Sequence, residues 1–201
     1  MLLSHIIEDD EALACFARRY SAQASASVAQ AYLRRARVRA FFNSSGEMVA
    51  GYVLNCRAPF RYLSALPGTD AALPGTSRVR DFCEVTCIWI DRSVGQLDRV
   101  ALYVVCFADF VRSGKRYAIG GSTHPGVVAV QRQALPHLIY EGDALIDGER
   151  VPAWVYYGSL RTGLVGFARD LVRRLRRTRS RKAQKRRVST VSEMRRDATS
   201  G

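Results

Sequence analysis

The segment that decides the fold reads FCEVTCIWIDRSVGQLDRVALYVVCFADFVRSGKRYAIGG and covers residues 82–121. Its first nine residues, Phe82 to Ile90, are mostly apolar, which predicts a buried strand. Side chains of a strand alternate between its two faces. We therefore expect one face to carry Cys83, Val85, Cys87 and Trp89, and the other to carry Glu84, Thr86, Ile88 and Ile90.

A turn, a long helix and a short strand complete this segment. The turn is Asp91-Arg92-Ser93-Val94-Gly95, and apolar residues at helical spacing follow it. The buried stripe of the helix is expected to be Leu97, Val100, Ala101, Val104, Ala108 and Val111. Ser113-Gly114 ends the helix, and Tyr117 to Ile119 predicts a strand that runs into Gly120-Gly121-Ser122-Thr123.

The patterns on either side of this segment predict further helices and hairpins. Before it we expect a helix capped by Asp9 or Asp10, a helix from about Ser27 to Arg37, strands Val38 to Phe42 and Met48 to Leu54, a short strand Arg61 to Leu66, and a loop Pro67 to Arg80. After it we expect a short helix Val127 to Leu135 and strands His137 to Ile146 and Arg150 to Tyr157, joined by a tight turn at Asp147-Gly148.

The charge of the chain is concentrated near its C-terminus. The chain has 201 residues and a net charge of +13, but residues 1–160 hold 17 basic and 15 acidic side chains. Residues 161–187 hold 12 basic side chains and one acidic one. We expect a domain over residues 1–160, a basic amphipathic helix over residues 161–187 and a disordered end over residues 188–201.

The cysteine and histidine content favours neither a metal site nor a disulfide framework. Five cysteines occur without a CxxC pair, and the three histidines show no ligand spacing. The first residues lack the basic start of a signal peptide, and the longest apolar stretch, Val100 to Val111, is too short to cross a membrane. We expect a cytoplasmic protein without a metal, with peripheral contact to a membrane or nucleic acid through the basic tail.

The turn at residues 91–95 is suited to a phosphate group. A turn that feeds a helix N-terminus presents free backbone N–H groups, and the helix dipole adds positive potential. Gly95 would let a phosphate approach the backbone, and Arg92 would add a charge-assisted donor. The alternative for this turn is an ordinary strand-to-helix connection with a solvated arginine.

The order of elements over residues 6–157 resembles the GNAT acyltransferase superfamily. That family has two helices, a hairpin, a central strand followed by an Arg/Gln-x-x-Gly-x-Gly/Ala turn, a long helix, a strand, a short helix and a final pair of strands. The resemblance implies an α+β or α/β fold with a mixed central sheet flanked by helices. Here Leu97 replaces the second glycine or alanine, and the family's frequent tyrosine is absent from Val127 to Leu135.

The resemblance also implies a cosubstrate, acetyl-CoA or another acyl-CoA, which transfers its acyl group to an amine. The pyrophosphate would bind at Arg92, Ser93, Val94, Gly95 and Gln96. Backbone groups of Trp89, Ile90 and Asp91 would hold the pantetheine arm and the thioester carbonyl. The acceptor would be a small-molecule or macromolecular amine; a resemblance to phage DNA-modifying enzymes with the same plan keeps nucleic acid open.

Acyl transfer to an amine needs a base, an oxyanion stabiliser and an acid for the leaving thiolate. Glu84 is the candidate base, because apolar neighbours on its strand would raise its pKa. Its alternative role is an ion pair with Arg78 or Arg80. Tyr140 is the candidate acid, with a role in sheet packing as its alternative. His124 is the second candidate base or a residue that orients the substrate, or else a helix-capping or surface histidine.

Two classes of function remain open from the sequence. The first is an acyl-CoA-dependent N-acyltransferase. The second is a non-catalytic protein of the same fold that uses residues 161–187 to bind nucleic acid or an anionic membrane. The apolar stripe of the tail consists of Leu164, Phe167, Ala168, Leu171, Val172 and Leu175, and it could instead pack against the domain.

Overall fold

The computed structural model describes residues 2–24, 26–67, 79–163 and 165–166. Its strands form one seven-stranded sheet in the order β1-β2-β3-β4-β5-β7-β6. Neighbouring strands are antiparallel except β4 and β5, which are parallel. The strands are β1 (Leu3–Ile7), β2 (Arg37–Phe42), β3 (Met48–Asn55), β4 (Phe82–Ile90), β5 (Tyr117–Ser122), β6 (His137–Ile146) and β7 (Glu149–Ser159).

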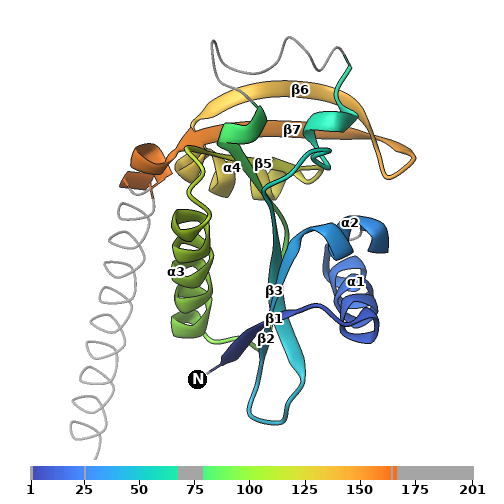
Figure 1. Ribbon diagram of the computed structural model, residues 1–201, viewed down its shortest axis with the longest axis vertical. Helices are drawn as coiled ribbons and strands as arrows, with labels where there is room; N and C mark the ends of the chain where they lie inside the picture. Colours follow the sequence, from blue (N-terminus) through green and yellow to red (C-terminus); the bar gives the residue numbers. More distant parts are fainter. Residues whose placement is uncertain (1, 25, 68–78, 164, 167–201) are drawn as a thin grey trace, which may run out of the picture.

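Helices cover both faces of the sheet. The helices are α1 (Asp10–Ala24), α2 (Gln30–Arg35), α3 (Gln96–Arg112) and α4 (Pro125–Ala134), with short 3-10 turns η1 (Leu63–Ala65) and η3 (Val79–Asp81). Figure 1 shows α1 and α2 on one side of the central strands and α3 on the other, while β6 and β7 curve across the end of the sheet. This mixed sheet between helices confirms the expected fold class.

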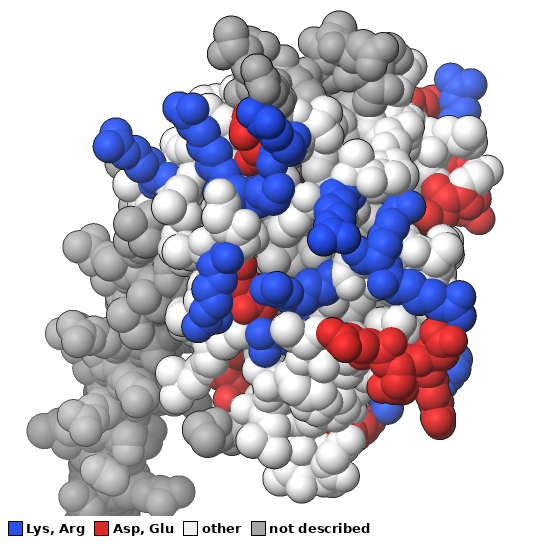
Figure 2. Space-filling view, viewed as in Figure 1, with Lys and Arg blue, Asp and Glu red and all other residues white. Residues whose placement is uncertain are grey.

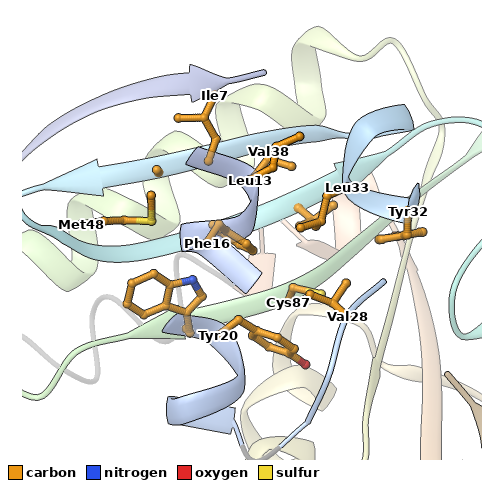
Figure 3. Packing of buried hydrophobic residues seen from close by; sticks show 13 residues of the cluster. Ile7, Leu13, Phe16, Tyr20, Val28, Tyr32, Leu33, Val38, Met48 and Cys87 are labelled. Carbon is orange, nitrogen blue, oxygen red and sulfur yellow. The ribbon is translucent and has the colours of Figure 1, made fainter. Parts of the chain in front are cut away.

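The largest core cluster lies between α1, α2 and the sheet (Figure 3). Leu13, Phe16 and Tyr20 follow helical spacing on α1 and are buried, so this face of α1 packs onto the strands. Phe16 meets the ring of Trp89 edge to face, with ring centroids 6.0 Å apart. Complete burial of such side chains stabilises the fold by about 1.5–3 kcal/mol each.

Two expectations for the N-terminal half were wrong. No strand was expected at residues 3–7, but β1 pairs with β2 at the sheet edge. Only Ile7 of β1 is buried, so an edge strand of this kind carries no alternating apolar pattern. Residues 61–66 form no strand; they contain η1, because the backbone N–H groups of Arg61 and Tyr62 donate to the Glu84 carboxylate instead of a ladder.

The second half of β4 presents its side chains differently from the expected alternation. Gly51 of β3 faces Trp89 and Val53 faces Thr86, so β4 has one more residue than β3 in this interval. Cys87 has φ of 50°, which marks a β-bulge. Cys87 and Trp89 therefore join Glu84 on the α1 and α2 side of the sheet, while Cys83, Val85 and Ile88 pack on the α3 side.

The face of α3 that packs on the sheet also differs from the expected stripe. Its buried residues are Leu102, Cys106, Asp109 and Phe110. Asp109 is held there by Arg39 and Tyr52, which turns a polar position toward the strands. The expected stripe lies on the opposite side of α3, where Leu97 is 82% exposed.

Several local predictions agree with the structure. The connection between β2 and β3 is closed by Asn43, whose side-chain oxygen accepts from the N–H groups of Ser45 and Glu47. The tight turn Asp147-Gly148 joins β6 and β7, and both residues have positive φ. Most of the expected loop at residues 67–80 and of the basic tail lies outside the described residues. The domain boundaries therefore stay a prediction.

Candidate functional site

The central feature of the site is a gap between β4 and β5. The two strands pair only where Phe82, Cys83 and Glu84 face Tyr117, Ala118 and Ile119. Beyond Glu84 the strands separate, and the rest of β5 pairs with β7 alone. The edge of β4 from Val85 onward thus offers backbone hydrogen-bonding groups to a ligand that enters the gap.

The β-bulge of β4 lies beside this gap. At a bulge two residues of one strand face one residue of the other, so part of the backbone leaves the ladder. Cys87 and Ile88 occupy this position opposite Tyr52. The free backbone N–H and C=O groups of a bulged strand are suited to an extended ligand with amide groups, and to a carbonyl oxygen that gains charge during a reaction.

The turn between β4 and α3 is held in one shape by its own side chains. The Asp91 carboxylate accepts from the Ser93 N–H at 2.8 Å and from the Ser93 hydroxyl at 2.7 Å. These hydrogen bonds lower the pKa of Asp91 below its ordinary value. The Arg99 guanidinium donates to the carbonyl oxygens of Val94 and Asp91, at 2.9 and 2.8 Å. The N–H groups of Asp91, Ser93 and Val94 also have acceptors, namely the Val49 carbonyl, the Asp91 carboxylate and the Asp91 carbonyl. The N–H groups that remain for an anion are therefore those at the N-terminus of α3.

Gly95 is the N-cap of α3 and is exposed. The N–H groups of the first helical turn have no acceptor within a helix, and the helix dipole makes this end positive. A Cβ built at Gly95 would meet no heavy atom within 4 Å, so the space in front of the cap is open. Leu97 points into solvent and does not fill this space. The geometry fits a phosphate group.

Glu84 lies in the sheet interior and is 0% exposed. Its carboxylate accepts from the Tyr32 hydroxyl at 2.6 Å and from the N–H groups of Arg61 and Tyr62 at 2.7 and 2.8 Å. Burial raises the pKa of Glu84 above its ordinary value, against the opposing effect of these donors. Arg80 is not among these partners, Arg78 lies outside the described residues, and the role of Glu84 as a base stays a prediction.

Arg61 is a functional candidate that the sequence reading missed. Its side chain is 4% exposed and forms an ion pair with Asp147 at 2.6 Å. It also donates to the Ser27 carbonyl at 2.6 Å and to the Tyr20 hydroxyl at 3.5 Å. One buried guanidinium thus joins the α1–α2 connection to the β6–β7 turn. The only signal in the sequence is an arginine between the aromatic residues Phe60 and Tyr62.

Gln131 on α4 is a second candidate that the sequence did not indicate. Its amide nitrogen donates to the carbonyl of Gly121 on the separated part of β5, at 3.0 Å. Its side-chain oxygen is buried and accepts no hydrogen bond from the part of the chain that the structure describes. Buried polar atoms are normally satisfied, so this oxygen suits a donor on a ligand beside β5.

The remaining predicted residues lie in different surroundings. Tyr140 is on β6 and donates its hydroxyl hydrogen to the carbonyl of Asp143 at 2.6 Å. His124 is exposed at the start of α4, where its backbone N–H donates to the Ser122 hydroxyl. The side chain of Trp89 packs against α1, so only its backbone can line the gap.

The described residues contain no cluster of three His, Cys, Asp or Glu side chains that could hold a metal ion. Within the same residues no helix is both long and apolar enough to cross a membrane.

Known structures share this fold. No protein-family model and no curated protein sequence matches the chain. FeeM, an N-acyl amino acid synthase from uncultured soil microbes, is 10% identical with a TM-score of 0.56 and covers 80% of this chain and 92% of its own. An N-acetyltransferase from Staphylococcus aureus is 9% identical with a TM-score of 0.51 and covers 80% and 99%.

A third structure was determined with a ligand. It is a GNAT superfamily phosphinothricin acetyltransferase from Sinorhizobium meliloti in complex with acetyl-CoA, with 13% identity and a TM-score of 0.51. It covers 79% of this chain and 88% of its own length. At such identities the likeness concerns the fold alone, and it confirms the fold that the resemblance to the GNAT superfamily implied.

Proposed function

We propose that this protein is an acyl-CoA-dependent N-acyltransferase. One observation carries the proposal: β4 and β5 separate beyond Glu84, and β4 then ends in a turn that presents free N–H groups at the N-terminus of α3. An extended ligand with a phosphate at one end and a thioester at the other matches this arrangement. The neighbour bound to acetyl-CoA has the same fold, which supports this choice of ligand.

The proposed donor site runs from the turn to the bulge. Backbone groups at Gly95 and Gln96, with the side chain of Arg92, would bind the pyrophosphate. The pantetheine arm would follow β4 through Trp89, Ile90 and Asp91, and the oxygen of Gln131 would accept from one of its amide groups. Ser93 and Val94 would shape the turn rather than contact the ligand by their side chains, because Ser93 bonds to Asp91 and Val94 is buried.

The proposed reaction is nucleophilic acyl transfer. The amine nitrogen attacks the thioester carbonyl carbon, a C–N bond forms, and the C–S bond breaks as CoA leaves. The nitrogen loses one proton, and the thiolate takes one up. Backbone N–H groups at the bulge of β4 would stabilise the oxyanion between these steps. Tyr140 and His124 remain proposed proton-transfer residues, whereas for Glu84 we propose that its main role is to hold Arg61 and Tyr62 in place.

The acceptor is proposed to be a primary amine. Two of the neighbours are named for amino-acid chemistry, an N-acyl amino acid synthase and a phosphinothricin acetyltransferase. Amino acids are therefore the first acceptors to assay, followed by polyamines, peptides and nucleic acid. Release of free CoA thiol in the presence of each acceptor measures the transfer.

Donor binding is tested by calorimetry on the full chain with acetyl-CoA, longer acyl-CoAs and free CoA. We expect Gly95→Asp to weaken CoA binding by at least tenfold, because a carboxylate would stand where the pyrophosphate binds. Gly95→Asn is the matched control of the same shape without the charge, and open space at the cap lets both variants fold. Equal affinity of the two variants, or no binding of any thioester by the unmodified chain, would overturn the proposal.

The calorimetry and the thiol-release assay together also distinguish an enzyme from a non-catalytic binding protein. A chain that binds CoA but releases no thiol with any amine would favour it. A chain that binds nucleic acid or anionic vesicles without binding CoA would favour it more strongly.

A further inference from the structure

Helix α3 has two apolar faces, and only one of them packs on the sheet. Leu102, Cys106 and Phe110 face the strands. On the opposite side Leu97, Val104 and Val111 recur every seven residues and are 82%, 46% and 45% exposed. A helix that is apolar on opposite sides is normally covered on both. We define Leu97, Val104 and Val111 as the outer stripe of α3.

The chain continues from the domain at this helix. After β7 ends at Ser159, a helical turn begins at Leu160, whose N–H donates to the carbonyl of Arg116 at 3.4 Å. A Cβ built at Gly163 would lie 3.6 Å from Cε2 of Phe107 on α3 and 3.9 Å from the carbonyl oxygen of Ala134 on α4. Gly166 lies against Gln133 and Ala134. The chain therefore passes between the end of α4 and the side of α3 there. Figure 1 shows this turn, in orange, next to the end of α3 that is farther from the turn after β4.

The residues that follow have a matching apolar stripe. Leu164, Phe167, Ala168, Leu171, Val172 and Leu175 share one helical face, with arginines on the rest. From Gly163 to Leu175 a helix would rise about 18 Å, and from Phe107 back to Leu97 α3 rises about 15 Å. In the other direction α3 ends after about 8 Å, at Arg112. The apolar stripe of residues 164–175 can therefore lie along α3 over most of its length only if it runs from Phe107 toward Leu97.

We propose that residues 164–175 form a helix that covers the outer stripe of α3 and runs antiparallel to it. This arrangement buries two apolar surfaces that would otherwise both face water. The start of the helix at Phe107 is fixed by the preceding turn, so little chain entropy opposes the contact. The remaining arginines of the segment would stay in solvent or meet anions.

The same arrangement would bring positive charge to the turn at residues 91–95, where the phosphate end of CoA is proposed to bind. We call this turn the donor turn. With one residue of the tail passing one residue of α3, Arg174 lies level with Gln96 and at the edge of the tail's apolar stripe. Arg173 lies on the opposite side of the tail helix and faces away from α3. The N-terminus of α3 is itself positive, so it and Arg174 would repel each other unless an anion lies between them. This consequence rests on the proposed function, because the anion would be the phosphate end of CoA.

Thiol labelling of the full chain tests the contact directly. We compare Val104→Cys on the outer stripe with Val127→Cys on α4, because the two valines are 46% and 44% exposed. Labelling with a methanethiosulfonate reagent, read by peptide mass spectrometry, should be at least tenfold slower at position 104. The double substitution Phe167→Asp and Leu171→Asp should raise the rate at position 104 to that at position 127.

Two results would overturn the contact. Equal rates at positions 104 and 127 in the otherwise unmodified chain would show that nothing covers the outer stripe. A slow rate at position 104 that the double substitution leaves unchanged would show that another surface, such as a second copy of the chain, covers it. Mild oxidation gives an independent readout: Val104→Cys should form a disulfide with Phe167→Cys but not with Thr178→Cys.

The donor-side consequence has its own measurement. Arg174→Gln should weaken CoA binding about tenfold, while Arg173→Gln, on the opposite side of the tail helix, should leave it nearly unchanged. Unchanged affinity of Arg174→Gln, in a chain whose position 104 is protected, would overturn this consequence. A chain that binds no CoA at all contradicts the proposed function, and the labelling result still decides the contact.

Discussion

At the scale of single residues, buried charges determine how the parts of the fold are joined. Glu84 ties the segment before η1 to β4, and Arg61 ties that segment to the α1–α2 connection and to the β6–β7 turn. Asp109 joins α3 to β2 and β3 through Arg39 and Tyr52. Removal of one partner from such a buried group costs more than the loss of a surface contact.

Glu84→Gln separates a positioning role from a catalytic one. One carboxylate oxygen of Glu84 accepts from the Tyr62 N–H, and the other accepts from the Arg61 N–H and the Tyr32 hydroxyl. A glutamine keeps only one of these oxygens and turns its NH2 group toward the donors on the other side. We expect a loss of about 2 kcal/mol or more in the free energy of unfolding, measured by urea denaturation. Tyr32→Phe removes one donor and should cost about 1 kcal/mol. Unchanged stability with a turnover loss of about 10²–10⁴-fold would instead identify Glu84 as the base.

Asp109 makes the free energy of unfolding depend on pH in the acidic range. Burial raises the pKa of Asp109, but hydrogen bonds from Arg39 and Tyr52 more than offset this, so its pKa lies below the ordinary value of 3.8. Its stabilising effect is thus full above pH 3.8 and is lost as the pH falls through the lower folded value. We expect Asp109→Asn to lower the free energy of unfolding by about 3 kcal/mol at pH 7 and by less in acid.

A surface pair provides the control for Asp109. Asp143 lies 3.5 Å from Arg150, and both side chains are more than half exposed. Asp143→Asn should change the free energy of unfolding by less than about 0.5 kcal/mol. A similar loss for both variants at pH 7 would contradict the importance of the buried pair.

Cys56 is expected to be the most reactive thiol among the described residues. A hydrogen bond from Cys83, whose sulfur lies 2.9 Å away, lowers the pKa of Cys56 to about 7, and Ser113 and Lys115 act in the same direction. Iodoacetamide labelling of Cys56, followed by mass spectrometry, should have its midpoint near pH 7. In Cys83→Ala the midpoint should move up; a midpoint above 8 in the unmodified protein would contradict the prediction.

At the scale of elements, the donor turn depends on one side chain of the helix that follows it. Arg99 holds the carbonyls of Val94 and Asp91 and so fixes which backbone groups face outward. Arg99→Lys keeps the charge but loses the forked geometry of the guanidinium. We expect CoA binding about tenfold weaker, with little change in the melting temperature. Arg92→Lys is the control, because exposed Arg92 would contact the phosphate mainly by its charge.

At the scale of the whole molecule, charge separates the domain from its tail. Figure 2 shows basic and acidic groups interspersed over the visible face of the described residues. Residues 161–187 hold 12 of the 31 basic side chains, so binding to polyanions should depend mainly on them. We expect Lys185→Gln, Arg186→Gln and Arg187→Gln together to reduce the slope of log affinity for DNA against log salt by about 2 to 3.

Binding of acetyl-CoA is the control measurement for this triple variant. The triple variant should bind acetyl-CoA as the unmodified chain does, because these residues lie beyond the stripe that ends at Leu175. An unchanged salt slope for DNA would show that polyanion binding, if it occurs, does not use the end of the basic segment.

The spacing of apolar and turn residues along the sequence determined β4, the turn after it and α3, which together form the proposed CoA site. The run Phe82 to Ile90, the glycine-terminated turn and the helix after it depend on neighbours in sequence, so the strand, the N-cap at Gly95 and the GNAT order of elements were predictable. The hairpins at Asn43 and Asp147-Gly148 were predictable for the same reason, since turn residues act on their own backbone.

Tertiary structure alone decided which side chains face each other. Alternation on β4 fails at Cys87 because the bulge forms against β3. The two-residue period of a strand sequence cannot show where such a bulge forms, because the partner strand is distant in sequence. Helix α3 is apolar on two sides, so its period could not select the face that Asp109 turns to the sheet. Arg61 and Glu84 are 23 residues apart and meet only because the fold closes around them.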